Sequence, residues 1–96
     1  MTSYVLPREI AELISKGEIV YSEHYRNEME VSVEDILFCL LESAYFVQKQ
    51  KDEKIQSKYK WIIYGESLAG QPMRVVGKII IIEKKKFFII TAFLER

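Results

Sequence analysis

The stretch that decides the fold is MRVVGKIIIIEKKKFFIITAFLE, residues 73 to 95, in which three lysines separate two runs of β-branched and aromatic residues. Such runs on either side of a short polar break are typical of two antiparallel strands joined by a tight connection. We therefore predict strands over residues 73–83 and 87–95, with residues 84–86 as the turn. Gly77 interrupts the first run, and a glycine inside a strand often marks a bulge.

Two further strand candidates precede this pair, AYFVQKQ at residues 44–50 and KYKWIIYG at residues 58–65. The segment between them, residues 51–57, is charged, and SLAGQP at residues 67–72 is rich in turn-forming residues. Four strands joined by short connections predict an antiparallel meander.

Helices are predicted in the N-terminal half. Pro7 suits a first helical turn and Gly17 suits a left-handed helix end, which predicts a helix over residues 7–16. Ser22 can accept a hydrogen bond from the backbone amides ahead of it, so a short second helix is expected to begin there.

A third helix is expected over residues 33–43, where ILFCLL supplies a buried face. Ser32 precedes it and Asp35 follows three residues later, which is the pattern of a capping box. Helices followed by strands predict an α+β domain, with N-terminal helices packed on a four-stranded antiparallel sheet.

The last two predicted strands are apolar on both faces, because Phe87 and Ile89 point one way while Phe88 and Ile90 point the other. A sheet covered by helices on one face only would alternate apolar and polar residues. The second face is therefore expected to be covered by the first helix or by curvature of the strands, or else by a partner peptide or a second copy of the chain.

Composition indicates one folded domain over residues 1–96, since 96 residues of which 49% are apolar suffice for a single core. The single cysteine, Cys39, lies in an apolar run and is expected to be a buried, reduced thiol. The uninterrupted apolar segments of the chain are too short to span a bilayer, so we expect a cytoplasmic protein with no membrane partner.

The formal net charge of zero conceals a division along the chain. Residues 1–48 carry three basic and nine acidic side chains, a net charge of −6, whereas residues 49–96 carry eleven basic and five acidic ones, a net charge of +6. Such a division predicts a molecule with a basic face that attracts a polyanion.

Four motifs in order, HYRNEMEVSVEDI, YKWIIYG, GQPMRVV and IIEKKKFFIITAF, carry a resemblance to a known family. They resemble a widespread domain-of-unknown-function family with the pattern H-x-x-x-E-M, S-x-x-D, L-x-x-G, G-x-P-x-H-V-V and I-T-V-Y. The match covers residues 19–94 and leaves the helix within residues 1–18 outside. Members are similar to RelE and ParE type toxins, a group placed with metal-independent ribonucleases such as barnase and the colicin nuclease domains.

The resemblance implies helices followed by a four-stranded antiparallel sheet, and an endoribonuclease toxin neutralised by an antitoxin peptide. The family histidine corresponds to His24, its following acid to Glu28 and its last-strand threonine to Thr91. Arg74 stands where members often have a second histidine, and Phe93 where they often have tyrosine. These two departures remove an imidazole and a hydroxyl from the groups that transfer protons.

RNA cleavage without a metal needs a base, an acid and positive charge at the phosphate. His24 is the one side chain that titrates near neutral pH when unperturbed, and Glu28, one helical turn later, is placed to orient it. Arg74, with Lys60 or Lys78, is expected to supply the cation. We thus predict a catalytic group of His24, Glu28, Arg74 and Thr91. Alternatively, His24 has no catalytic role and is a surface residue of the helix paired with Glu28.

Lysines alternate with aromatic residues between residues 49 and 64, an arrangement that holds single-stranded bases in other proteins. The predicted RNA-binding residues are Lys58, Lys60, Trp61, Tyr64 and Lys78. Alternatively, the lysines form a solvated edge and Trp61 belongs to the core.

Neither a metal nor another cofactor is expected, because one histidine and one acid at this spacing lack the further ligands that zinc needs. Two classes of function remain open: a RelE/ParE-like endoribonuclease, and a non-catalytic module that binds protein or nucleic acid, with a homodimer as a further possibility.

Overall fold

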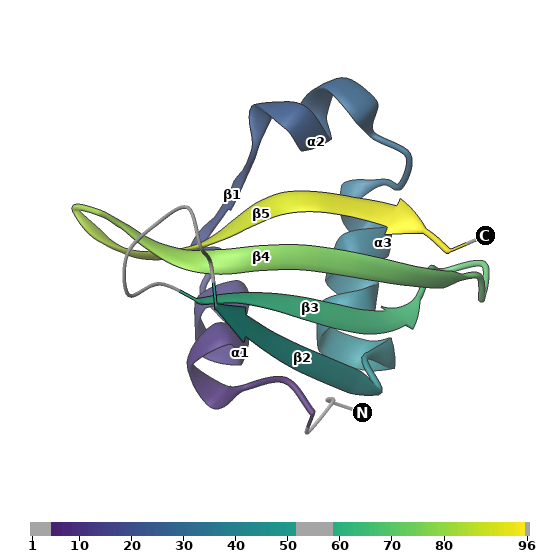
Figure 1. The fold of residues 1–96 in the computed structure, drawn as a ribbon, viewed down its shortest axis with the longest axis horizontal. Helices are drawn as coiled ribbons and strands as arrows, with labels where there is room; N and C mark the ends of the chain where they lie inside the picture. The colour runs from purple at the N-terminus through teal and green to yellow at the C-terminus, as the bar shows by residue number, and fades with distance from the viewer. Residues whose placement is uncertain (1–4, 52–58, 96) are drawn as a thin grey trace.

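A computed structural model of the chain describes residues 5–51 and 59–95. The elements in chain order are α1 (Arg8–Ser15), β1 (Ile19–Tyr21), α2 (Glu23–Glu28), α3 (Val33–Phe38), the π-helical turn η1 (Cys39–Ser43), β2 (Phe46–Lys51), β3 (Tyr59–Glu66), β4 (Pro72–Ile82) and β5 (Lys84–Leu94) (Figure 1). The architecture is α+β, as predicted.

The sheet has five strands in the order β1-β5-β4-β3-β2. Strands β2 to β5 form the predicted antiparallel meander. The prediction of four strands is wrong, because Ile19 pairs with Phe87 and the short β1 runs parallel to β5 at the edge of the sheet. Three residues carry too little pattern to reveal a strand when their partner lies near the other end of the chain.

The turn between β4 and β5 is also displaced from its predicted place. Ile82 pairs with Lys84, and Glu83 between them adopts a left-handed φ of 67°. The lysines at 84–86 therefore begin β5. Lys84 forms an ion pair with Glu18, and Lys85 Nζ lies 2.7 Å from a carboxylate oxygen of Glu9. Acidic side chains of the N-terminal half thus neutralise part of the basic C-terminal half within the molecule.

The predicted irregularity at Gly77 is confirmed. Val76 pairs with Thr91 but Gly77 pairs with Ile89, so Ile90 is an extra residue in β5. Because the extra residue lies in β5, successive side chains of β4 still alternate between the two faces of the sheet along the whole strand.

Both predicted serine caps are present. The Ser22 side chain accepts a hydrogen bond from the Tyr25 amide at 3.0 Å and begins α2. Ser32 and Asp35 form the reciprocal capping box at the start of α3. The carboxylate of Asp35 also accepts the Leu68 amide at 2.9 Å, which ties the β3–β4 connection to this helix. Gly17, with a φ of 75°, follows α1 as predicted.

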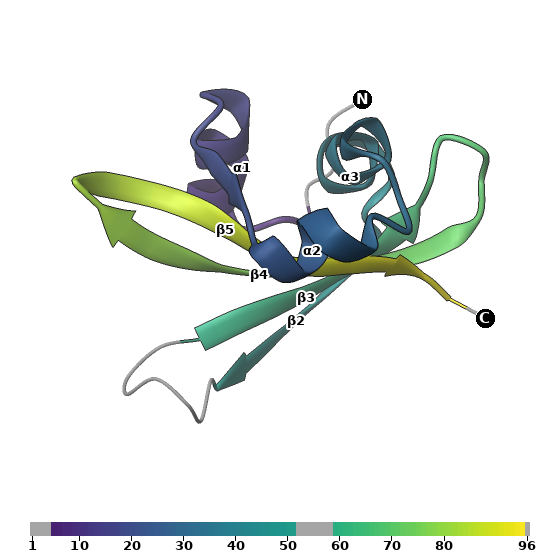
Figure 2. The same cartoon turned by 90° about the horizontal axis from the view of Figure 1, so that it is seen from above.

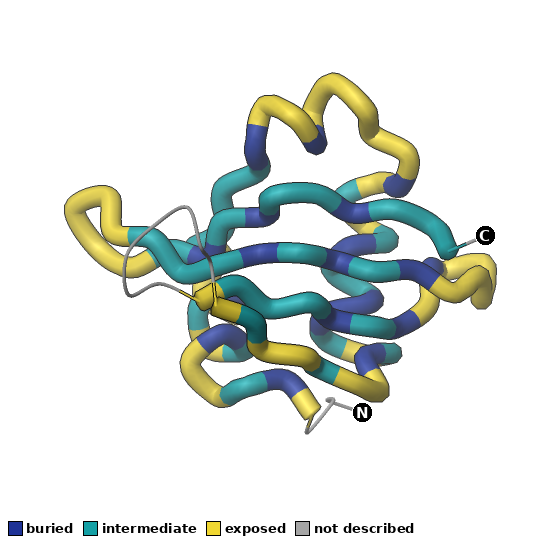
Figure 3. The backbone as a smooth tube through the Cα atoms, in the orientation of Figure 1, coloured by how far each residue is buried: buried dark blue, intermediate teal, exposed yellow. Residues whose placement is uncertain are grey.

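Helices α1 and α3 lie on the same side of the sheet (Figure 2). One apolar core joins Ile10 and Ile14 of α1 to Ile36 of α3 and to Ile63 and Val75 of the sheet. The interpretation in which the first helix covers the second sheet face is therefore wrong. Figure 3 shows buried positions alternating with half-buried ones along β3, β4 and β5.

No described helix lies over the opposite side of the sheet (Figure 2), and we call this side the uncovered face. From the strand register and alternation, it carries Lys60, Ile62 and Tyr64 of β3, Arg74, Val76 and Lys78 of β4, and Phe88, Thr91 and Phe93 of β5.

Candidate functional site

Helix α2 lies beside the edge of β5, beyond the end of β1 (Figures 1 and 2). Ser22 fixes it there, because its amide donates to Ile89 O at 2.9 Å and its hydroxyl donates to Ile90 O at 2.5 Å. On the inner side of the helix, the buried Tyr25 donates its hydroxyl to Val31 O at 2.7 Å. These bonds hold the outer face of α2 in a defined position relative to β5.

A cavity of about 420 Å³ lies between α2 and β5, and we call it the α2 hollow. It is lined by His24, Glu28, Glu30, Thr91, Ala92 and Phe93. Three of the four residues predicted to be catalytic thus line one hollow, although they come from opposite ends of the chain. The position of Thr91 follows from the bulge, which places its side chain on the uncovered face.

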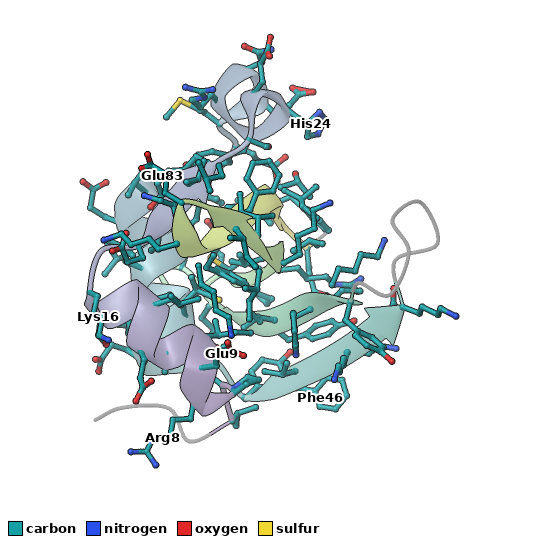
Figure 4. The ribbon with its side chains drawn as sticks, turned by 90° about the vertical axis from the view of Figure 1, so that its left-hand side faces the viewer. Arg8, Glu9, Lys16, His24, Phe46 and Glu83 are labelled. Atoms are coloured by element: carbon teal, nitrogen blue, oxygen red, sulfur yellow. The ribbon has the colours of Figure 1, made fainter. Side chains whose placement is uncertain are left out.

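His24 and Glu28 are both exposed, and neither side chain makes a hydrogen bond or an ion pair with any residue in the described ranges. Figure 4 shows His24 projecting from α2 toward the same side of the molecule as Phe46. The predicted contact in which Glu28 orients the imidazole is therefore not formed.

The predicted cation is absent from the lining of the hollow, which has no lysine or arginine among the described residues and in which Glu28 and Glu30 supply two carboxylates. Arg74 lies on β4, where its Nε donates to Glu95 Oε1 at 2.5 Å. This hydrogen bond to Glu95 is the largest cause that raises the pKa of Arg74 above its ordinary value. The guanidinium is thus engaged by a carboxylate. Glu30 is also engaged, since its Oε2 accepts the Leu94 amide at 2.6 Å.

The predicted RNA-binding residues divide between the two sides of the sheet. Lys60, Tyr64 and Lys78 share the uncovered face with Arg74, on the side of the sheet away from the helices. Trp61 points to the helix side and packs against the core. Lys58 lies outside the described residues.

Tyr64 is the centre of an aromatic group on the uncovered face. The Arg74 guanidinium carbon lies 4.8 Å from the centroid of its ring. The rings of Phe46 and Tyr45 lie 5.4 Å and 6.5 Å from it, centroid to centroid. Sequence reasoning found Tyr64 but missed both neighbours, whose proximity depends on the β2–β3 register that pairs Phe46 with Tyr64.

The main chain of Ala92 is a second feature that sequence reasoning missed. Its side chain belongs to the core, whereas its main chain borders the α2 hollow at the edge of β5 that faces away from β4. Alanine gives no chemical signal in a sequence, so only the arrangement of α2 and β5 identifies this position.

Comparison of the chain with protein families, curated proteins and solved structures finds no match. No helix in the described residues has both the length and the apolar character needed to cross a membrane. The described residues contain no cluster of histidine, cysteine and acidic side chains suited to a metal ion.

Proposed function

We propose that this chain is a RelE/ParE-like domain that binds single-stranded RNA across the uncovered face of its sheet. The observation that carries the proposal is the stack of Arg74 over Tyr64, beside Phe46, on an open antiparallel sheet. Bases of single-stranded RNA stack on aromatic rings and on guanidinium planes, and sheet faces commonly present such rings.

The charges on this face support a nucleic-acid ligand. Lys60 and Lys78 project from β3 and β4 on the same side as the aromatic group. Arg74 lies on β4, where it pairs with Tyr64 of β3 on one side and with Phe93 of β5 on the other. A backbone that follows the lysines would bring its bases over the rings, which is the arrangement expected for sequence-tolerant binding.

RNA cleavage is a second candidate function, because His24, Glu28 and Thr91 line one hollow at the border of the same face. It ranks below binding on electrostatic grounds. Phosphoryl chemistry without a metal needs positive charge at the phosphate, whereas Glu28 and Glu30 make this hollow negative. Addition of RNA in the presence of a chelator, with His24→Ala as the comparison, measures whether cleavage occurs.

A protein partner is a further candidate, since Ile62, Val76 and Phe88 give the uncovered face an apolar character. An antitoxin peptide or a second copy bound there would bury these side chains and exclude RNA. Light scattering over a range of concentrations measures whether the chain forms dimers, and competition with RNA shows whether the two ligands share the face.

The test of RNA binding uses a labelled single-stranded oligonucleotide and fluorescence anisotropy at several salt concentrations. Tyr64→Leu should weaken binding about tenfold, the effect of losing one stacked base, while Tyr64→Phe should retain it. Tyr59→Leu is the matched control, because Tyr59 lies on the same strand but points to the other side.

The affinity should fall as salt rises, since phosphate contacts release counterions. Equal effects of the substitutions at Tyr64 and Tyr59, or binding that salt leaves unchanged, would remove the proposed interface.

A further inference from the structure

We propose that the α2 hollow binds a guanine base, held by the main chain of Ala92 and the carboxylate of Glu28. The inference rests on the proposed RNA binding. It names the base that binds most tightly in the hollow at the border of the uncovered face. Four observations lead to it: an open peptide edge, the capping of its neighbours, a free carboxylate and an aromatic wall.

The direction of the Ala92 peptide edge follows from the pairing of β4 with β5. Glu95 donates its amide to Pro72 O at 2.9 Å, so it faces β4. Inward and outward main-chain groups alternate along an antiparallel strand, so Ala92 and Leu94 turn their N–H and C=O groups away from β4. The Leu94 amide agrees with this direction, since it donates to Glu30 beside α2.

The chain's own residues cap the outward groups on both sides of Ala92. Ser22 occupies the carbonyl groups of Ile89 and Ile90, and Glu30 occupies the amide of Leu94. In the part of the chain that the structure describes, nothing pairs with the outward N–H and C=O of Ala92, because β1 pairs only with residues 87–89. Ala92 is only 3% exposed, and a buried peptide group without a partner is unfavourable.

One donor and one acceptor on a single residue do not suffice for an added strand, which would need a row of such pairs. They do match a planar group that carries an acceptor next to a donor. Every nucleobase has such an edge, and the volume of about 420 Å³ lies in the range of small-molecule sites.

The carboxylate of Glu28 selects among the bases. It lines the hollow and has no hydrogen-bond or ion-pair partner among the described residues. Guanine alone presents an acceptor, O6, followed by two N–H donors, N1 and N2, along one edge. The Ala92 amide donates to O6, the Ala92 carbonyl accepts from N1–H, and Glu28 accepts from the N2 amino group.

Phe93 links this position to the uncovered face. Its side chain lines the hollow and also lies beside Arg74 in the strand register. An RNA strand on the sheet can therefore turn one base over the edge of β5, where the aromatic ring packs against it. The negative lining favours a donor-rich base over a phosphate at this point.

The test is a titration of the ¹⁵N-labelled chain with guanosine monophosphate and, separately, inosine monophosphate, followed in amide spectra. The two nucleotides differ only in the N2 amino group. Guanosine monophosphate should shift the Ala92 amide and bind about tenfold more tightly than inosine monophosphate, the effect expected for one hydrogen bond to a charged acceptor.

Glu28→Gln should reduce the affinity for guanosine monophosphate to about that for inosine monophosphate. Glu23→Gln is the matched control, because Glu23 carries the same charge on the same helix but does not line the hollow. Unchanged dispersion of the other amides shows that each variant is folded. Equal affinities for the two nucleotides, or no effect of Glu28→Gln, would overturn the guanine site.

This inference and the proposed function fail separately. If RNA binds in a Tyr64-dependent manner while neither nucleotide shifts Ala92, the guanine site is wrong and the RNA-binding face stands. If guanosine monophosphate shifts Ala92 and RNA does not bind to the sheet, the guanine site stands and the proposed function is wrong.

Discussion

The ring of Phe87 lies so close to the backbone of Gly77 that a Cβ atom at Gly77 would be 2.5 Å from Cζ of Phe87. Gly77→Ala should therefore destabilise the fold by about 1–3 kcal/mol, the usual effect of overpacking a core. Urea unfolding measures the loss of free energy.

Part of the loss should be recovered in the double variant with Phe87→Leu, because the smaller side chain relieves the clash. Independent, additive effects of the two substitutions would contradict this account of why β4 has glycine opposite Phe87.

The Arg74–Glu95 ion pair predicts a gain of function. Glu95→Gln removes the carboxylate that holds the Arg74 guanidinium, so this cation becomes available to RNA. The slope of log affinity against log salt should become steeper by about 0.7, which corresponds to one more phosphate contact with a single strand. Glu34→Gln, on the helix side of the sheet, should leave the slope as it is. If the slope of log affinity against log salt is also unchanged in Glu95→Gln, Arg74 does not contact a phosphate.

The capping box at α3 predicts a pH dependence of stability. Hydrogen bonds from the Leu68 amide, and then from Ser32, hold the pKa of Asp35 below its ordinary value of 3.8. A carboxyl group whose pKa is lowered by folding contributes its stabilisation above that ordinary value, and the contribution is lost as pH falls through the lowered value. At pH 7, Asp35→Asn should reduce stability by about 1 kcal/mol.

In thermal or urea unfolding, the difference between Asp35→Asn and the parent should shrink at pH values below the ordinary pKa. A difference that stays constant down to the lowest accessible pH would show that the Asp35 charge is not responsible.

The thiol of Cys39 is predicted to be unreactive in the folded chain. Its side chain is fully buried, and this burial raises its pKa to about 11. Only the thiolate attacks disulfide reagents, so Ellman's reagent at pH 8 should label the native protein slowly and the urea-unfolded protein at once. Rapid stoichiometric labelling without urea would indicate that the packing of η1 against β3 opens readily.

The local elements of this fold were predictable because short segments specify them. Ser22 and Ser32 begin helices through bonds to amides three residues away, and Gly77 lies at the register shift between β4 and β5. The β4–β5 turn was misplaced because three lysines resemble a loop by composition. In the molecule, Glu9 and Glu18 pair with these lysines along the start of β5.

The candidate sites were only partly predictable, since they depend on which side of the sheet each residue faces. Tyr64 and Arg74 meet because β3 and β4 pair in one register, and Trp61 points away for the same reason. The α2 hollow requires the position of α2 beside β5, which no local pattern encodes. Within the described residues, the N–H and C=O groups of Ala92 stay unpaired because β1 ends at Tyr21, so the residue type at position 92 does not predict this feature.

The pairing of β1 with β5 has a consequence for biosynthesis. Residues 19–21 leave the ribosome long before residues 87–89, their partners in the sheet, have been translated. Contacts between segments so distant in sequence form only after the entropy of closing a long loop has been overcome. The nascent chain therefore exposes the apolar side of α1, which packs against β5, until that strand has been made, and chaperones can bind the chain during that interval.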